Sequence, residues 1–230
     1  MDQPTESDSF SASAKRRSRS RGWRFAVGAL MAAAVITLVI RATVVDFFYI
    51  GSASMESTLN PGDGLLVNRL AYKHEPIQRG DIIIFDGRGS FLPYQRPSAV
   101  DSLAWALRLA GNDSVYVKRV IGVAGDTVTC CGPDGKIRVN GLPLDEPYVF
   151  AGDNPSEQEF TAQVPHGRIW VMGDHRSVSE DSRALLGAPG GGMIPVDRVL
   201  GQVTEVIWPL DRKRPVGDGS MEPGFASGND

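Results

Sequence analysis

The chain has 230 residues, of which 42% are hydrophobic and 22% charged, and this is enough for one sizeable folded core or two small domains. Its formal net charge is −3, but the first 24 residues are net +3, so the remainder is net −6. An acidic main domain argues against a nucleic-acid partner.

The chain begins with a basic tail and an apolar run. Residues 1–22 are polar and serine-rich, and we expect a disordered cytoplasmic tail. The apolar run 25–40 contains no charged residue. As a helix it spans about 24 Å, short of a hydrocarbon core of about 30 Å, but Trp23 can anchor one end and Arg41 can snorkel at the other while the helix continues.

The run therefore predicts one transmembrane helix over residues 23–45, with the basic N-terminus inside and the rest of the chain extracytoplasmic. A cleavable signal peptide is the alternative. It is disfavoured because the apolar part is long and because Ile40-Arg41-Ala42 places a bulky residue where cleavage needs a small one.

From residue 46 to 210, short apolar runs alternate with turn residues, which predicts a mainly β domain. Turn signals such as Asn60-Pro61-Gly62-Asp63 and Asn140-Gly141 separate the runs. The expected strands are 64–67, 81–85, 115–117, 120–123, 136–139, 168–172 and 199–203. Residues 211–230 have the composition of a polar flexible tail.

Two stretches depart from this β pattern. Residues 98–109 carry apolar side chains at helical spacing, which predicts one amphipathic helix, packed on the core or lying on lipid. Cys130 and Cys131 are adjacent, and their bonding state stays open because a bond between neighbours closes a strained ring. No pair of histidines or cysteines has metal-site spacing, so we expect no metal and no other cofactor.

Ser54 follows the apolar helix closely, and the chain contains only three histidines that could activate it. Lys118 offers another base, because it lies inside the apolar run Val115-Tyr116-Val117-Lys118-Arg119-Val120. Burial there would lower its pKa from about 10.4, so that the neutral amine could take the serine proton. A serine with a desolvated lysine forms a nucleophile and base pair.

A polar segment, Met172 to Arg183, follows an expected strand. Ser179 is a candidate for orienting the lysine amine, and Asp181 with Arg183 is a candidate ion pair that braces the loop. The alternative is a solvated polar loop without a catalytic role.

Four ordered segments carry a family resemblance. They are Ser52-Ala53-Ser54-Met55 with Thr58-Leu59 and Gly62-Asp63; Arg79 to Phe85; Tyr116 to Gly122 with Gly125-Asp126; and Gly173 to Arg176 with Ser179 and Asp181-Ser182-Arg183. In this order they resemble the blocks of bacterial type I signal peptidase, the leader peptidase family of Ser-Lys serine proteases. The resemblance covers about residues 25–210. It implies a largely antiparallel β-sheet catalytic domain with a smaller β domain inserted, here at about 129–165.

Carried over residue by residue, the resemblance implies that Ser54 is the nucleophile and Lys118 the general base. Ser52 and the Ser54 backbone N–H would form the oxyanion hole. Ser179 would orient the lysine, Asp181 and Arg183 would support the site, and Asp174 and Gly173 would form the turn before them. The implied substrate-pocket positions are Phe48, Ile50, Met55, Leu59, Tyr116 and Val117. Gly51 and Ser57 stand where prolines are common, and His175 where asparagine is usual.

The implied function is a single-pass cell-membrane endopeptidase that removes signal peptides from exported preproteins, with these preproteins and the lipid bilayer as partners. A hydrolase that uses His175 and Asp174 is disfavoured, because adjacent residues rarely form a base and its orienting group and no G-x-S-x-G surrounds Ser54. A penicillin-binding protein is disfavoured because no serine lies three places before a lysine. A non-catalytic β domain that binds peptides or surface polymers, including an inactive family member, stays an alternative.

Overall fold

The computed structural model describes residues 22–37, 44–92 and 114–217. Most of the expected N-terminal tail, the expected helix 98–109 and most of the expected tail 211–230 lie outside these residues.

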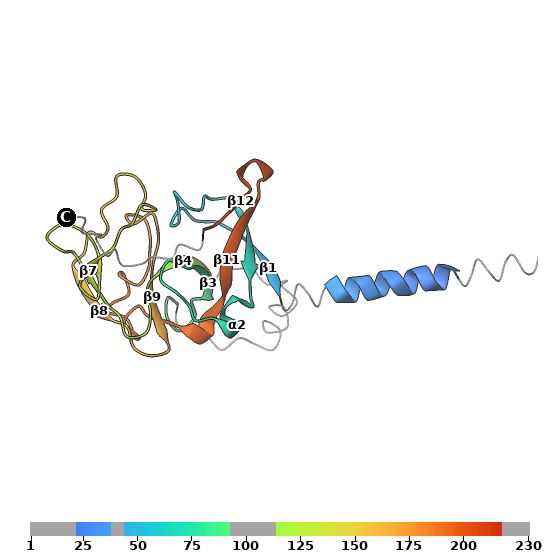
Figure 1. Cartoon of the computed structure of the whole chain (residues 1–230), viewed down its shortest axis with the longest axis horizontal. Coiled ribbons are helices and arrows are strands. Elements are labelled where there is room, and N and C mark those ends of the chain that lie inside the picture. Colours follow the sequence, from blue (N-terminus) through green and yellow to red (C-terminus); the bar gives the residue numbers. More distant parts are fainter. Residues whose placement is uncertain (1–21, 38–43, 93–113, 218–230) are drawn as a thin grey trace, which may run out of the picture. The chain divides into compact units, whose positions relative to one another are not determined.

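An α-helix covers residues 22–37 (Figure 1). Its side chains are exposed, including those of Trp23, Phe25 and Leu30. Among the residues described, no helix is both long and apolar enough to cross a membrane. Val45, which was expected to end the apolar helix, instead begins strand β1 (Val45–Tyr49). Its β-branched side chain suits a strand better than a helix.

The compact unit that starts at Val44 is built on an eight-stranded sheet (Figure 1). The strand order is β1-β2-β11-β3-β4-β9-β10, with β12 paired to β11, and every pairing is antiparallel. The predicted mainly β class is therefore confirmed. The bounds are β2 (Gly64–Asn68), β3 (Ile82–Asp86), β4 (Val115–Gly122), β9 (Arg168–Met172), β10 (Ile194–Pro195), β11 (Val199–Trp208) and β12 (Arg214–Pro215).

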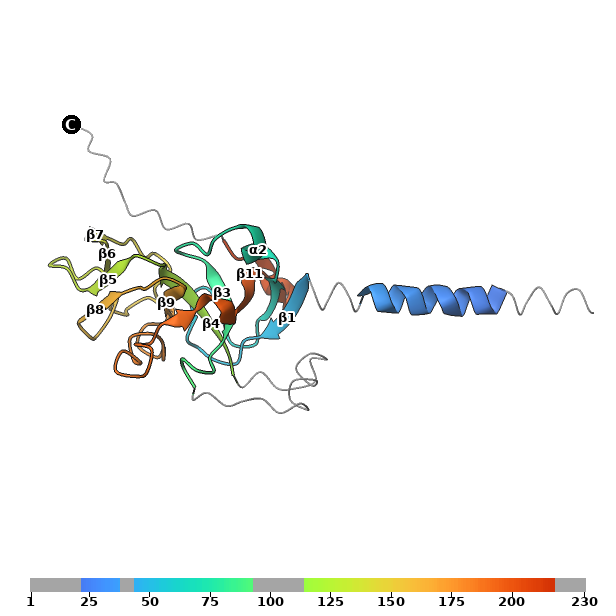
Figure 2. The same ribbon diagram turned by 90° about the horizontal axis from the view of Figure 1, so that it is seen from below.

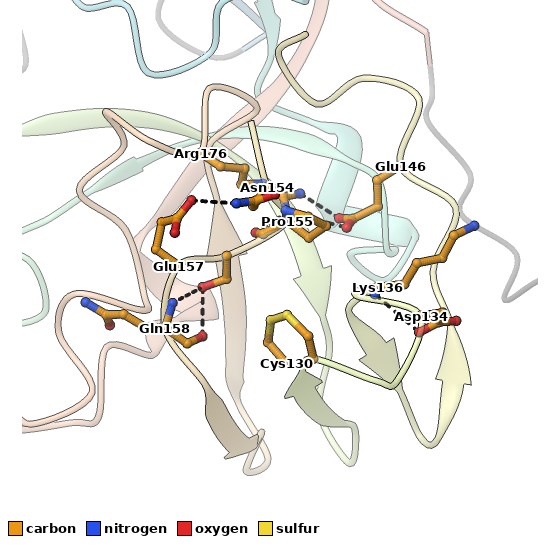
Figure 3. Close-up of a disulfide and its surroundings, with 11 residues drawn as sticks. Cys130, Asp134, Lys136, Glu146, Asn154, Pro155, Glu157, Gln158 and Arg176 are labelled. Carbon is orange, nitrogen blue, oxygen red and sulfur yellow. Dashed lines mark hydrogen bonds and ion pairs between the residues drawn. A yellow bond between two sulfur atoms is a disulfide. The ribbon is translucent and has the colours of Figure 1, made fainter. Parts of the chain in front are cut away.

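A second, four-stranded antiparallel sheet has the order β7-β6-β5-β8 (Figure 2). Its strands are β5 (Thr127–Cys130), β6 (Arg138–Val139), β7 (Leu142–Pro143) and β8 (Phe160–Gln163), which overlap the stretch expected as an insert. Cys130 and Cys131 are joined by a disulfide at the end of β5 (Figure 3). The short helices are α2 (Ala71–His74), η1 (Val196–Arg198) and η2 (Leu210–Arg212).

Strand β3 is buried on both faces, which explains its uninterrupted apolar sequence. Because side chains alternate along a strand, Ile82 and Ile84 join the cluster that contains Met55 and Leu59, whereas Ile83 and Phe85 join a second cluster. Strand β4 pairs with β3 along its length. The central core strand thus fixes the position of the strand that carries Lys118.

Candidate active site

Ser54 lies in the loop between β1 and β2, and this loop is held in place by backbone bonds and buried anchors. Ile50 N donates to Asp63 O at 2.9 Å, which closes the base of the loop. Leu59 N donates to Met55 O at 2.7 Å, and both side chains are buried in the core. Met55, the residue directly after Ser54, is therefore immobilised by packing.

Lys118 lies in the middle of β4, opposite Ile83 of β3. Its Nζ donates to Ser54 Oγ at 2.6 Å. Lys118 is only 3% exposed, and this burial lowers its pKa from 10.5 to about 8. Asp181 and Asp174 oppose the shift, and the Arg183 guanidinium assists it. A useful fraction of the amine is consequently neutral near neutral pH.

A cavity of about 320 Å³ opens beside this pair, between residues 49–55 and 115–118. The hydroxyl of Ser52, an exposed residue, lies 3.3 Å from Ser54 Oγ. Among the expected pocket residues, Ile50, Met55, Tyr116 and Val117 line this cavity. Phe48 and Leu59 are not among its lining residues and belong to the neighbouring buried core.

The loop after β9 is organised around Asp181. Gly173 N donates to Asp181 Oδ2 at 3.0 Å, and the Arg183 guanidinium binds both carboxylate oxygens at 2.9 and 2.8 Å. Burial alone would raise the pKa of Asp181, but the bonds from Arg183 and Gly173 outweigh it and lower the pKa. Asp181 is thus held as a carboxylate.

Gly173 brings this loop against the turn that contains Ser54. A Cβ atom at this position would lie 2.3 Å from Ser179 Oγ and 2.4 Å from Ser54 O, so only glycine fits. Two residues further on, His175 N donates to Ser54 O at 3.2 Å. The loop after β9 therefore binds the backbone of Ser54 directly.

Ser179, expected to orient the lysine, is half-buried beside Gly173, and its hydroxyl oxygen is buried. In the part of the chain that the structure describes, its hydroxyl makes no hydrogen bond with acceptable geometry, to Lys118 or to any other group. It lies close enough to Asp181 to contribute to lowering the pKa of that carboxylate.

Asp174 has a partner that sequence reasoning missed. Arg119, the neighbour of Lys118, binds both oxygens of Asp174 at 2.8 and 2.7 Å, and both side chains are buried. Its guanidinium also donates to Gly80 O at 3.0 Å. The available signal was an arginine inside an apolar strand, because a buried cation needs an anionic partner.

The residues described contain no group of three histidine, cysteine or acidic side chains placed to hold a metal ion. The chemistry that this arrangement supports is nucleophilic attack by a serine whose proton passes to a neutral amine.

Comparison with known proteins gives a consistent picture. Residues 23–208 match the sequence model of a family described as signal peptidase, peptidase S26. The chain is 31% identical to the probable signal peptidase I of Mycobacterium leprae, over 97% of this chain and 91% of that protein. It is 36% identical to the signal peptidase I of Mycobacterium tuberculosis, over 84% and 75%, and 34% identical to that of Leptolyngbya laminosa, over 77% and 76%.

Proposed function

The chain belongs to the type I signal peptidases of family S26, and from this we propose that it cleaves signal peptides from exported preproteins, with Ser54 as nucleophile and Lys118 as general base. The observation that carries the proposal is the 2.6 Å contact between Ser54 Oγ and the buried Lys118 Nζ. A lysine can accept a proton only when it is neutral, and its pKa of about 8 makes this possible.

In the proposed reaction, the preprotein lies extended in the cavity between residues 49–52 and 115–118, where backbone hydrogen bonds fix its register. Ser54 Oγ attacks the scissile carbonyl carbon while its proton passes to Lys118 Nζ. Ser52 and the Ser54 backbone N–H hold the resulting oxyanion, and such donors contribute roughly 3 kcal/mol each.

Collapse of the tetrahedral intermediate breaks the C–N bond, and the Lys118 ammonium gives its proton to the leaving amine. The acyl group stays on Ser54 Oγ. Lys118, neutral again, takes a proton from a water molecule that attacks the ester carbon. The bond from this carbon to Ser54 Oγ then breaks, Lys118 returns the proton to Oγ, and the signal peptide leaves with a free carboxylate.

A cleavage assay with the full-length protein tests this assignment. Ser54→Ala and Lys118→Met should each abolish cleavage of a signal-peptide substrate. Ser156→Ala and Lys136→Met are matched controls, because Ser156 bonds only locally to Gln158 and Lys136 pairs with Asp145 at the surface. Normal turnover by Lys118→Met would rule out the proposed base, and peptide binding without turnover by the unmodified protein would favour a non-catalytic role.

We also propose that the apolar stretch containing helix 22–37 anchors the enzyme in the cell membrane in a single pass, with the basic N-terminus in the cytoplasm. Support comes from the uncharged run 25–40 and from the exposure of Trp23, Phe25 and Leu30. An anchor would raise the effective concentration of membrane-held preproteins. The full-length protein should stay in the membrane pellet after alkaline carbonate extraction, and release into the supernatant would contradict the anchor.

A further inference from the structure

Residues 146–153, between β7 and β8, contact all three segments that form the candidate site. Ser57, in the nucleophile loop, donates its hydroxyl proton to Tyr148 O. The Arg119 guanidinium, next to Lys118 on β4, lies 4.0 Å from the centre of the Tyr148 ring. Phe150 N donates to Asp174 O at 3.0 Å, which reaches the loop after β9. No sequence motif had singled out this segment as part of the site.

Tyr148 is held rigidly between two arginines. The Arg176 guanidinium lies 5.9 Å from the centre of its ring, and the phenol donates to Glu146 Oε1 at 2.8 Å. Arg176 in turn binds Glu146 at 2.6 Å (Figure 3). Burial raises the pKa of the phenol well above its ordinary value, so the donor is permanent.

Arg119 makes two kinds of contact, one with an aromatic ring and one with a carboxylate. The central carbon of its guanidinium lies over the Tyr148 ring, while Nε and Nη2 bind Asp174 in a bidentate pair. A guanidinium stacked on an aromatic face keeps its hydrogen-bonding edge free and correctly aimed. Tyr148 therefore fixes the orientation of the pair that joins β4 to the loop after β9.

Phe150 supports the nucleophile turn through His175. The two rings stack with centres 4.0 Å apart and an interplanar angle of 13°. His175 Nδ1 lies 3.0 Å from Glu56 Oε2, and its Nε2 lies 4.0 Å from Asp153 Oδ2. The stacked ring thus ties Glu56, in the turn that carries Ser54, to the loop after β9.

We propose that Tyr148 and Phe150 are positioning residues for the Ser54–Lys118 pair, acting through Arg119 and His175. This inference rests on the function proposed above. The nucleophile and the base come from segments far apart in the sequence, and catalysis is sensitive to misplacements as small as 1 Å. Neither aromatic residue lines the cavity beside Ser54, so their loss should lower kcat and leave KM nearly unchanged.

The test compares Tyr148→Leu and Phe150→Leu with Phe160→Leu in the full-length enzyme. Phe160, in β8, is a matched control because it is also an aromatic residue, and it is buried. Its ring centre lies 5.3 Å from that of Trp170, in the core cluster next to the four-stranded sheet. We expect the first two variants to lose roughly tenfold to hundredfold in kcat. Phe160→Leu should lower Tm and keep kcat. Tyr148→Phe, which keeps the ring under Arg119, should retain most activity.

The pH profile separates positioning from a loss of stability. The charges of Asp181, Asp174 and Glu180 raise the pKa of Lys118, whereas Arg183 lowers it. When Arg119 loses its ring support, it neutralises Asp174 less well, and the pKa of Lys118 should rise. The acidic limb of kcat/KM should then move to higher pH in Tyr148→Leu and stay in place in Phe160→Leu.

Wild-type kcat in Tyr148→Leu and Phe150→Leu, at a Tm loss like that of Phe160→Leu, would overturn the inference. If Ser54→Ala is inactive in the same assay, the proposed function survives that result. Absence of cleavage by the unmodified enzyme overturns both. If Tyr148→Leu does not fold, the kcat and KM of Phe150→Leu decide the question.

Discussion

Replacing Lys118 by methionine is expected to stabilise the folded protein at neutral pH while it removes the proposed base. Burial lowers the pKa of this amine to about 8, whereas in the unfolded chain it keeps the ordinary value of 10.5. The unfolded state therefore binds more protons between these two pKa values. Stability falls as the pH drops from 10.5 to about 8, and the full penalty persists below that pH.

The size of the penalty follows from the two pKa values. They differ by about 2.5 pKa units, which at ~1.36 kcal/mol per unit corresponds to about 3 kcal/mol. The variant loses the hydrogen bond from Lys118 to Ser54, a loss of about 1 kcal/mol. The net gain is about 2 kcal/mol, or roughly 4–8 °C in Tm for a protein of this size.

Thermal unfolding of the full-length protein at pH 7, 9 and 10.5 measures this effect, with the surface variant Lys136→Met as the control. The advantage of Lys118→Met should be largest at pH 7 and should shrink as the pH approaches 10.5, where the unfolded chain also releases its proton. Two results would refute the reasoning. One is a wild-type protein more stable than Lys118→Met at pH 7. The other is a difference that does not change with pH.

Three further results are expected from activity measurements. The kcat/KM should rise about tenfold from pH 7 to 9 and level off above the pKa of Lys118, about 8; a steady rise to pH 10 would show an ordinary lysine. Gly173→Ala should lose about a hundredfold in kcat because its Cβ would meet Ser54 O at 2.4 Å, whereas Gly187→Ala, with open space at its Cβ, should be unaffected. Ser52→Ala should lower kcat by about a hundredfold with KM little changed, and a loss confined to KM would argue against an oxyanion role.

The large sheet was the part of the fold most accessible from sequence. Its strands are buried on one or both faces, and continuous or alternating apolar runs record that burial, as in β3 and β9. The short strands β7, β10 and β12 were missed, because two residues carry no period and each of these strands contains a proline. The four-residue strands β5 and β8 were missed as well. Strand β1 was missed because its first residue, Val45, was assigned to the apolar helix and Asp46 interrupts the apolar residues that follow.

Sequence reasoning named the residues at the centre of the site and the supporting pair Asp181–Arg183, but it did not find the contacts that Arg119 and Tyr148 make. Ser54 and Lys118 stand out locally, as a serine after an apolar helix and a lysine within an apolar strand. Their supports are set by tertiary contacts between distant segments, such as Arg119 with Asp174 and Tyr148 with Arg119. A residue type can show that a partner is needed, as the buried Arg119 does, but it cannot show which partner the fold supplies.

Two buried carboxylates, Asp174 and Asp181, lie near Lys118, and each raises the pKa of this amine, which burial lowers. In both cases an arginine neutralises the carboxylate. Both oxygens of Asp174 accept hydrogen bonds from Nε and Nη2 of Arg119, and both oxygens of Asp181 accept them from Nε and Nη2 of Arg183, so each carboxylate is neutralised by a bidentate guanidinium. The effect of burial is then the largest one, and the pKa of Lys118 is lowered.

Because burial lowers the pKa of Lys118, a molecule that covers this amine should change its pKa further. The open cavity beside Ser54 lets water approach Lys118, and an extended peptide lying there would exclude that water. We therefore expect the pKa of Lys118 to fall further when substrate binds, so that the amine is most fully deprotonated when Ser54 must attack. The pH at which kcat reaches half its maximum should then lie below that for kcat/KM, because kcat reports the enzyme with substrate bound. Equal pH midpoints for kcat and kcat/KM would show that the bound peptide does not exclude water from Lys118.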